Sequence, residues 1–210
     1  MNKAARITAA VFGTFAGIGG IEHGYLEIQQ GNVKPEGIMI TSMGPPCEAD
    51  AVWHACEPAM TILPNFLITG VLAVILGIIT IIWSLFFVQR RHGGLVLFIL
   101  SFLLLLFGGG IFPPLIGIIG GIVGTRIHAS LSWRRKSLTD KPLRFFAALW
   151  PWSIILYILL LFSQFIIGAI SNDFMMQNGF LILVLIPVLL VLVVISALTK
   201  DVQVVERELG

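Results

Sequence analysis

The chain has 210 residues, of which 57% are hydrophobic and only 11% are charged. A soluble globular protein averages about 25% charged residues, and a domain of this size still leaves about a quarter to a third of its unfolded-state surface in water. The composition therefore excludes an ordinary soluble domain, and a net charge of +2 gives no basic surface of the kind that binds nucleic acid. We expect an all-α integral membrane protein, with residues 1–210 forming one membrane domain.

The first predicted membrane span covers residues 1–21. Ala9, Gly13 and Gly17 recur in it every fourth residue, and small-residue faces of this kind let two membrane helices approach closely. The alternative is a secretory signal peptide with a charged start and a weak small-residue cleavage site at residues 14–16. The repeat of small residues favours a helix that is retained.

A polar loop is predicted at residues 22–57, and it contains the only two cysteines of the chain, Cys47 and Cys56. The loop is too short to fold as an independent domain without a covalent link. On the oxidising outer side of a membrane the two cysteines are expected to form a disulfide. A redox-active pair is the alternative, but the eight intervening residues differ from the C-x-x-C spacing of thiol oxidoreductases.

The second predicted span, residues 58–88, contains no charged residue. Pro58 suits the first turn of a helix, and Glu57 would then lie beside the positive end of the helix dipole. Pro64 and Asn65 are expected to kink this helix near the outer interface and to free a backbone carbonyl there.

The third apolar stretch, residues 95–125, is interrupted. As one straight helix its roughly 31 residues would measure about 46 Å, which exceeds the roughly 30 Å of hydrocarbon in a bilayer. Three glycines at 108–110 and two prolines at 113–114 end one helix and begin another. We predict a broken helical hairpin whose arms either cross as two short spans, giving six in all, or dip into the bilayer as a re-entrant loop.

The basic residues set the orientation. Two further spans, 145–170 and 180–198, follow a basic loop at 126–144, and a polar tail at 199–210 ends the chain. With a hairpin, 12 of the 13 Lys and Arg residues lie on the side of the N-terminus and only Lys34 lies opposite, whereas a single crossing leaves 4 inside and 9 outside. The positive-inside rule favours the hairpin, four full crossings of the plasma membrane and two cytoplasmic termini.

Polar residues gather at the expected outer ends of the first two spans. Two histidines and three carboxylates are residue types that bind Zn²⁺ or another divalent first-row ion. Their spacing is not diagnostic because it contains no H-E-x-x-H pair, and solvated or helix-capping histidines are the alternative. The candidate metal ligands are Glu22, His23, Glu27, His54 and Glu57.

The tip of the hairpin is a second candidate site. Irregular backbone at membrane depth must be buried in protein or line a watery cavity, and transporters use broken helices to hold ions or substrate groups. The alternative is a tight turn whose glycines serve packing alone, as the two overlapping G-x-x-x-G pairs within 117–124 suggest. The candidate ligand-binding residues are Gly108, Gly109, Gly110, Phe112, Pro113, Pro114 and, at the start of the second span, Asn65.

No Asp, Glu, Lys or Arg lies in the middle of a predicted span, which weakens the case for a proton- or sodium-driven carrier. No nucleotide-binding loop or catalytic serine motif is present. Three hypotheses follow in order: a small transport or ligand-binding membrane component, a non-catalytic scaffold or accessory subunit, and an extracytoplasmic metal-dependent enzyme. The expected partners are the lipid bilayer and either a second copy of the chain or another membrane subunit, with no nucleic acid.

Overall fold

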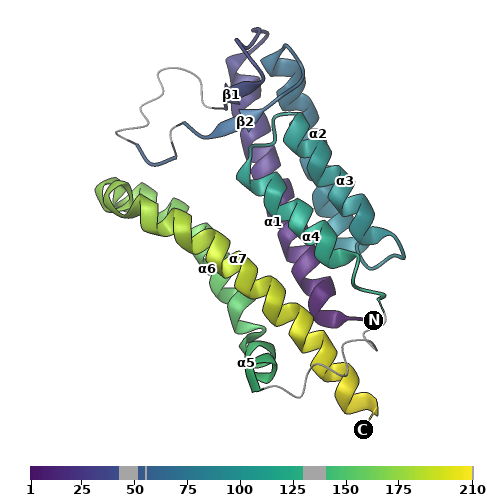
Figure 1. Ribbon diagram of the computed structural model, residues 1–210. Helices are drawn as coiled ribbons and strands as arrows, with labels where there is room; N and C mark the ends of the chain where they lie inside the picture. The colour runs from purple at the N-terminus through teal and green to yellow at the C-terminus, as the bar shows by residue number, and fades with distance from the viewer. Residues whose placement is uncertain (43–51, 55, 130–140, 210) are drawn as a thin grey trace. The chain divides into compact units, whose positions relative to one another are not determined.

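A computed structural model describes residues 1–42, 52–54, 56–129 and 141–209. Within these ranges the chain forms seven helices and one two-stranded sheet (Figure 1), so the helical class is confirmed and the short sheet is an addition to it. Four of the helices, α1, α2, α6 and α7, are long and apolar enough to cross a membrane. The elements are α1 (Lys3–Gln30), β1 (Met39–Thr41), β2 (Pro58–Met60), α2 (Phe66–Phe86), α3 (Gly93–Leu106), α4 (Phe112–Gly124), α5 (Lys141–Leu149), α6 (Trp152–Ile170) and α7 (Asn172–Leu209).

Residue contacts divide the chain into two compact units. Unit 1 comprises Met1–Thr8, Asp50–Trp53 and His128–Gly210, and unit 2 comprises Ala9–Ala49 and His54–Ile127. Unit 2 therefore contains most of α1 together with the sheet, α2, α3 and α4. Unit 1 contains α5, α6 and α7.

In unit 2, α1 and α2 pack closely through glycines. A Cβ at Gly24 would lie 2.6 Å from the carbonyl oxygen of Gly70, and a Cβ at Gly77 would lie 2.7 Å from the carbonyl oxygen of Gly17. Late residues of α1 thus face early residues of α2, so the two helices run antiparallel. Because any larger residue would collide with the opposing backbone, glycine is what permits this approach.

The interrupted third stretch forms two antiparallel helices, α3 and α4, joined by a turn at residues 107–111. Gly94 faces Gly124, and Gly121 faces Phe98. The turn lies at the same end of unit 2 as the C-terminal end of α1, because α1 packs along the whole hairpin. The contacting pairs are Ala9–Gly124, Phe12–Gly120, Ala16–Gly117 and Gly19–Pro113.

Helix α1 continues to Gln30, beyond the predicted end of the first span at residue 21. The polar residues 22–30 contain no proline, so nothing in them forces the helix to stop. The helix ends where Gly31 adopts a φ of 79°, the left-handed conformation that commonly follows a helix C-terminus. The polar candidates at 22–27 therefore lie on a helix and have fixed directions, rather than lying in a loop.

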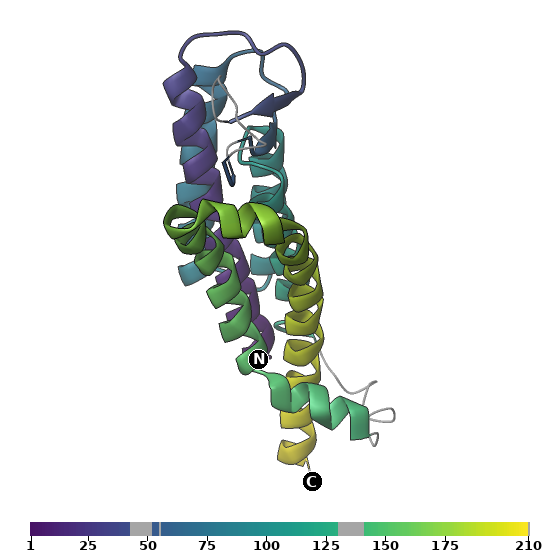
Figure 2. The ribbon, with the colours of Figure 1, turned by 90° about the vertical axis from the view of Figure 1, so that its left-hand side faces the viewer.

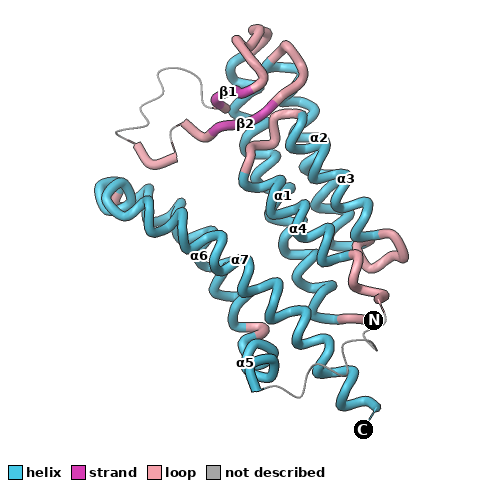
Figure 3. Tube along the Cα trace, in the orientation of Figure 1, coloured by secondary structure: helices cyan, strands magenta, loops and turns pink. Residues whose placement is uncertain are grey.

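The predicted helical start at residue 58 is wrong. Residues 58–60 form β2, which pairs antiparallel with β1 so that Thr41 faces Pro58 and Met39 faces Met60. Figure 3 shows these two short strands side by side. Pro58 consequently does not lie in a first helical turn, and Glu57 does not lie beside a helix N-terminus. Residues 58–60 adopt an extended conformation because they pair with the backbone of β1, a contact that the local sequence does not reveal.

Asn65 begins α2 instead of kinking it. Its side-chain oxygen accepts a hydrogen bond from the backbone N–H of Ile68 at 3.0 Å, and its side-chain nitrogen donates to Oδ1 of Asn32 at 2.5 Å. An N-cap side chain satisfies a backbone donor that has no partner within the helix. The predicted kink at Pro64 and Asn65 is therefore corrected to a helix start.

In unit 1, α6 and α7 run side by side (Figures 1 and 2). Oγ of Ser153 lies 2.7 Å from Oγ of Ser196. This joins the beginning of α6 to the second half of α7, so the two helices are antiparallel. Helix α7 has 38 residues and extends beyond the predicted span 180–198 at both ends.

Two further contacts in unit 1 join distant parts of the sequence. The Asp201 carboxylate accepts hydrogen bonds from the backbone N–H groups of Ala4 and Ala5, both at 2.8 Å. These donors belong to the first turn of α1 and have no partner within it, so a residue near the other end of the chain caps the helix. The backbone N–H of Trp53 donates to Oδ1 of Asn172 at 2.9 Å.

Candidate functional site

His23 and Glu27 stand one turn apart near the C-terminal end of α1. Residues four apart lie on the same face of a helix. Both side chains are buried, with exposed fractions of 3% for His23 and 0% for Glu27. Two buried titratable side chains on one helix face need either structural partners or a functional task.

The turn at residues 107–111 faces these two side chains. Gly108 and Gly110 have φ values of 87° and 82°, a conformation that residues with a Cβ rarely adopt. A Cβ at Gly110 would lie 2.5 Å from Nε2 of His23, and a Cβ at Gly108 would collide with the carboxylate oxygens of Glu27. The structure thus brings together the two sites that the sequence analysis treated separately.

Backbone hydrogen bonds hold the turn in place. The N–H of Gly108 donates to the carbonyl oxygen of Met60 at 2.8 Å, and the N–H of Ile62 donates to the carbonyl oxygen of Leu106 at 3.1 Å. Both partners of the turn belong to the segment that begins at β2. Because this segment directly follows Glu57, the contacts that hold the turn also bring Glu57 to the site.

Glu57 links the two histidines of the site. Its Oε2 lies 3.0 Å from Nε2 of His23, and its Oε1 contacts Nδ1 of His54. On the opposite side of the His23 ring, Nδ1 lies 2.6 Å from Oγ of Ser42. Burial alone would raise the pKa of the Glu57 carboxyl, but the hydrogen bonds and positive charges of the two histidines outweigh burial and lower this pKa to about 2. Glu57 is therefore a carboxylate with its charge already compensated.

Glu27 differs because it has no such partner. Both of its carboxylate oxygens are buried, and neither forms a hydrogen bond with any residue that the structure describes. An isolated buried carboxylate is strongly unfavourable, by several kcal/mol even after relaxation. The Glu27 carboxyl is therefore either neutralised by a proton or balanced by a positive charge that the described part of the chain does not supply.

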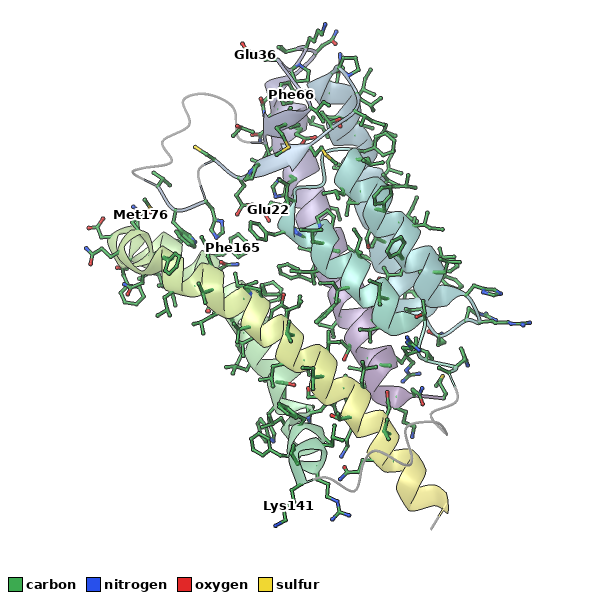
Figure 4. The ribbon with its side chains drawn as sticks, in the orientation of Figure 1. Glu22, Glu36, Phe66, Lys141, Phe165 and Met176 are labelled. Atoms are coloured by element: carbon green, nitrogen blue, oxygen red, sulfur yellow. The ribbon has the colours of Figure 1, made fainter. Side chains whose placement is uncertain are left out.

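We define the end cluster as His23, Glu27, Ser42, His54 and Glu57. Glu22 lies at its rim on α1 (Figure 4), where it is exposed yet close enough to be influenced by the charges of Glu57 and the two histidines. Ser42 was not among the predicted site residues, because a serine in a loop carries no signal until the fold places it against His23.

Gln30, at the last position of α1, holds the residues of β1 close to the end cluster. Its side-chain nitrogen donates to the carbonyl oxygens of Thr41 at 3.0 Å and Ser42 at 2.6 Å. This explains how Ser42 reaches the ring of His23. Gln30 was also absent from the predicted site, since a helix-terminal glutamine reads as an ordinary surface residue.

The charge balance of the end cluster favours positive ligands. With Glu22 at the rim, the site holds three carboxylates and two imidazoles and contains no Lys or Arg. The elements packed around it, α2, α3, α4, β1 and β2, contain no titratable side chain. A site lined by carboxylates with apolar walls attracts cations and repels anions.

Several of the predicted metal ligands lie close together in unit 2. In the ranges that the structure covers, no group of three or more His, Cys, Asp or Glu side chains is placed to hold a metal ion. A divalent first-row ion takes most of its ligands from such a group. Cys47 lies outside the described residues, so the Cys47–Cys56 disulfide stays a prediction.

The other predicted ligand residues have positions that packing explains. Phe112 is 57% exposed at the start of α4, and Pro113 contacts Gly19 of α1. Pro114 is buried in α4, and Gly109 packs against Leu104 of its own hairpin. The structure places Gly108 and Gly110, but not these residues, against the end cluster.

No protein-family model, curated protein or solved structure matches this chain. Function must therefore be inferred from the chemistry of the end cluster and the glycine turn.

Proposed function

We propose that this protein is a small membrane component that binds or transports a ligand, with the end cluster and the 107–111 turn as its ligand site. The observation that carries the proposal is Glu27, a fully buried carboxylate without a hydrogen-bond partner among the described residues, packed against Gly108. Native proteins satisfy nearly all buried polar groups. A conspicuous exception inside a cluster of titratable side chains is a functional-site candidate.

The broken hairpin supports a transport or binding role. Helices α3 and α4 have 14 and 13 residues, or about 20 Å each, which is shorter than the roughly 30 Å hydrocarbon layer. Their glycine turn is buried and lies against the titratable side chains His23 and Glu27 of α1. Transporters use interrupted helices in this way to bring backbone groups to an ion or substrate.

The proposal includes an orientation in the plasma membrane, with both termini in the cytoplasm and the end cluster on the extracytoplasmic side. The support is the distribution of basic residues, of which 12 of 13 fall on the cytoplasmic side in this arrangement. The antiparallel pairs α1–α2 and α3–α4 agree with it, since each pair returns the chain to the side from which it came.

A thermal-unfolding screen of the detergent-purified protein tests the ligand site. The probes are inorganic salts, small amines, free amino acids and simple sugars, each titrated separately. A ligand that binds only the folded state stabilises it by about 2.7 kcal/mol at a concentration 100 times its Kd. We expect at least one class to raise the Tm saturably in the wild-type protein.

The Gly108→Ala variant should lose this rise, because the added Cβ occupies the space beside the Glu27 carboxylate. Gly31→Ala is the matched control, since Gly31 has a similar φ of 79° but no atom within 4 Å of an added Cβ. The control should keep the ligand-dependent rise. If no class of compound raises the Tm of the wild-type protein, the proposed ligand site is wrong.

A further inference from the structure

We infer that the end cluster takes a small monovalent cation, held by the carboxylate of Glu27 and by backbone carbonyl oxygens of the turn at Gly108–Gly110. The ligand is either an alkali-metal ion or a compact primary ammonium group, which share a single positive charge and an affinity for oxygen ligands. This inference rests on the proposed function and adds to it the charge and size of the ligand.

A comparison of the carboxylates around the end cluster singles out Glu27. Glu57 is paired with His23 and His54, and Glu22 is exposed to solvent. Only Glu27 is both buried and without a partner among the described residues. One positive charge neutralises it, and a monovalent cation would do so in place of a proton. A divalent ion would leave an excess buried charge at a site with no further free carboxylate.

The carbonyl groups of the turn also lack hydrogen-bond donors within the described chain. Gly108, Gly109 and Gly110 are buried, and among the described residues none of their carbonyl oxygens accepts a hydrogen bond. Buried backbone carbonyls are normally paired. Two of the next residues along the chain are Pro113 and Pro114, which have no N–H to donate. The sequence therefore places acceptor oxygens where the first turn of the following helix offers few donors.

Carbonyl and carboxylate oxygens together form the ligand set that hard cations prefer. Rings of backbone carbonyls replace the hydration shell of monovalent cations in selective channels. Here one carboxylate lies against a turn with three carbonyl groups that accept no hydrogen bond within the described chain. This combination matches a monovalent cation better than it matches a sugar or an anion.

The closeness of the turn to α1 limits the size of the ligand. A Cβ at Gly110 would lie 2.5 Å from His23, and a Cβ at Gly108 would collide with Glu27. The backbone of the turn thus comes within direct coordinating reach of the side chains of α1. A compact ion bound directly by oxygens suits this closeness, whereas a larger organic cation does not.

The experiment follows thermal unfolding of the full detergent-purified chain at constant ionic strength. Chlorides of Li⁺, Na⁺, K⁺, ammonium and methylammonium are titrated against the bulky N-methylglucamine salt, with Ca²⁺ as a separate arm. We expect at least one small monovalent cation to raise the Tm saturably. Comparison of the alkali-metal titrations with the ammonium and methylammonium titrations shows which kind of cation the site prefers.

Variants assign the effect to Glu27. Glu27→Gln should abolish the cation-dependent rise, and Glu27→Asp, which keeps the charge on a shorter side chain, should retain it with at least a several-fold weaker apparent affinity. Glu36→Gln, which removes an exposed carboxylate of the loop after α1 (Figure 4), is the control and should leave the rise unchanged. If Glu27→Gln does not fold, calorimetric cation titration of the wild type and Glu27→Asp decides, with one site per chain expected.

Any of these results with salts overturns the inference: equal effects of all the salts, a cation effect that survives in Glu27→Gln, or a stronger effect of Ca²⁺ than of every monovalent ion. A neutral or anionic compound that raises the Tm only when Gly108 is intact would also overturn it, while leaving the proposed ligand site in place. If neither cations nor any other class acts, the ligand site and the cation inference both fail.

Discussion

At the scale of single residues, the site depends on the contrast between Glu27 and Glu57. Glu27 is buried and Glu57 is half-buried, but Glu57 contacts two histidines while neither carboxylate oxygen of Glu27 forms a hydrogen bond with a described residue. The same chemical group is therefore satisfied in one position and unsatisfied in the other. Surroundings, not residue type, distinguish a structural carboxylate from one that is available to a ligand.

Substitution of Gly108 should show how closely the turn approaches Glu27. Gly108→Ala and Gly31→Ala both force a residue with a Cβ into a positive φ, which costs about 1–3 kcal/mol. Gly108→Ala should lose about a further 1–3 kcal/mol because it overpacks the contact with Glu27. Denaturant unfolding of the two variants measures the difference, and equal losses would contradict the close contact.

Acid titration should reveal the pairing of Glu57. The folded-state pKa of Glu57 is lowered from 4.5 to about 2, so its contribution to stability is present above pH 4.5 and is lost as the pH falls toward 2. We expect the wild type to lose stability more steeply over this interval than Glu57→Gln, which cannot titrate there. Unfolding curves recorded at several acidic pH values make the comparison, and parallel losses would argue against the ionised pair.

At the scale of elements, the glycine and proline pattern of the third apolar stretch predicted where one helix ends and the next begins. Helices end at such residues for local reasons, namely backbone freedom and the missing proline donor. The strand at β2 and the extension of α1 to Gln30 were not predictable in this way. Strand pairing depends on a distant partner, and residues 22–30 lack the apolar pattern used to identify a span.

Small-residue faces, which motivated the scaffold hypothesis, are used within the chain: Gly24 and Gly77 pack against α2 and α1, and Gly121 packs against α3. A face that is occupied by the chain's own helices is not available to recruit a partner through the same residues.

Close packing between α1 and α2 can be tested at Gly77. A Cβ there would lie 2.7 Å from the carbonyl oxygen of Gly17, so we expect Gly77→Ala to destabilise the protein by about 1–3 kcal/mol through overpacking. Gly37→Ala is the control, because nothing lies within 4 Å of its added Cβ, and its effect should stay within about 0.5 kcal/mol. A similar Tm for both variants would mean that the two helices do not meet at Gly77.

At the scale of the whole molecule, residues far apart in the sequence form helix caps and side-chain clusters together. In unit 1, Asp201 caps the first turn of α1 through Ala4 and Ala5. In unit 2, the end cluster combines residues of α1 with Ser42, His54 and Glu57, and the α3–α4 turn lies against it. These assemblies arise from chain topology, which local patterns do not encode.

The proposed orientation is testable with single cysteines in unit 2. Lys34 and Arg91 are both exposed, and the proposal places them on opposite sides of the membrane. A membrane-impermeant thiol reagent applied to intact cells should label Lys34→Cys and leave Arg91→Cys unlabelled until the cells are opened. The unsubstituted chain measures background from the native cysteines, and labelling of Arg91→Cys from outside would reverse the orientation.

The sequence by itself determined the helical class, the four long apolar helices and the break at the triple glycine, because each depends on composition or on local backbone chemistry. It also supplied Glu27, His23 and Gly108 as candidates, but in two separate sites. Only the tertiary structure decided that these residues meet and that, among the described residues, Glu57 is paired while Glu27 is not. Burial and pairing are properties of the packed chain, since they depend on which distant groups approach each side chain.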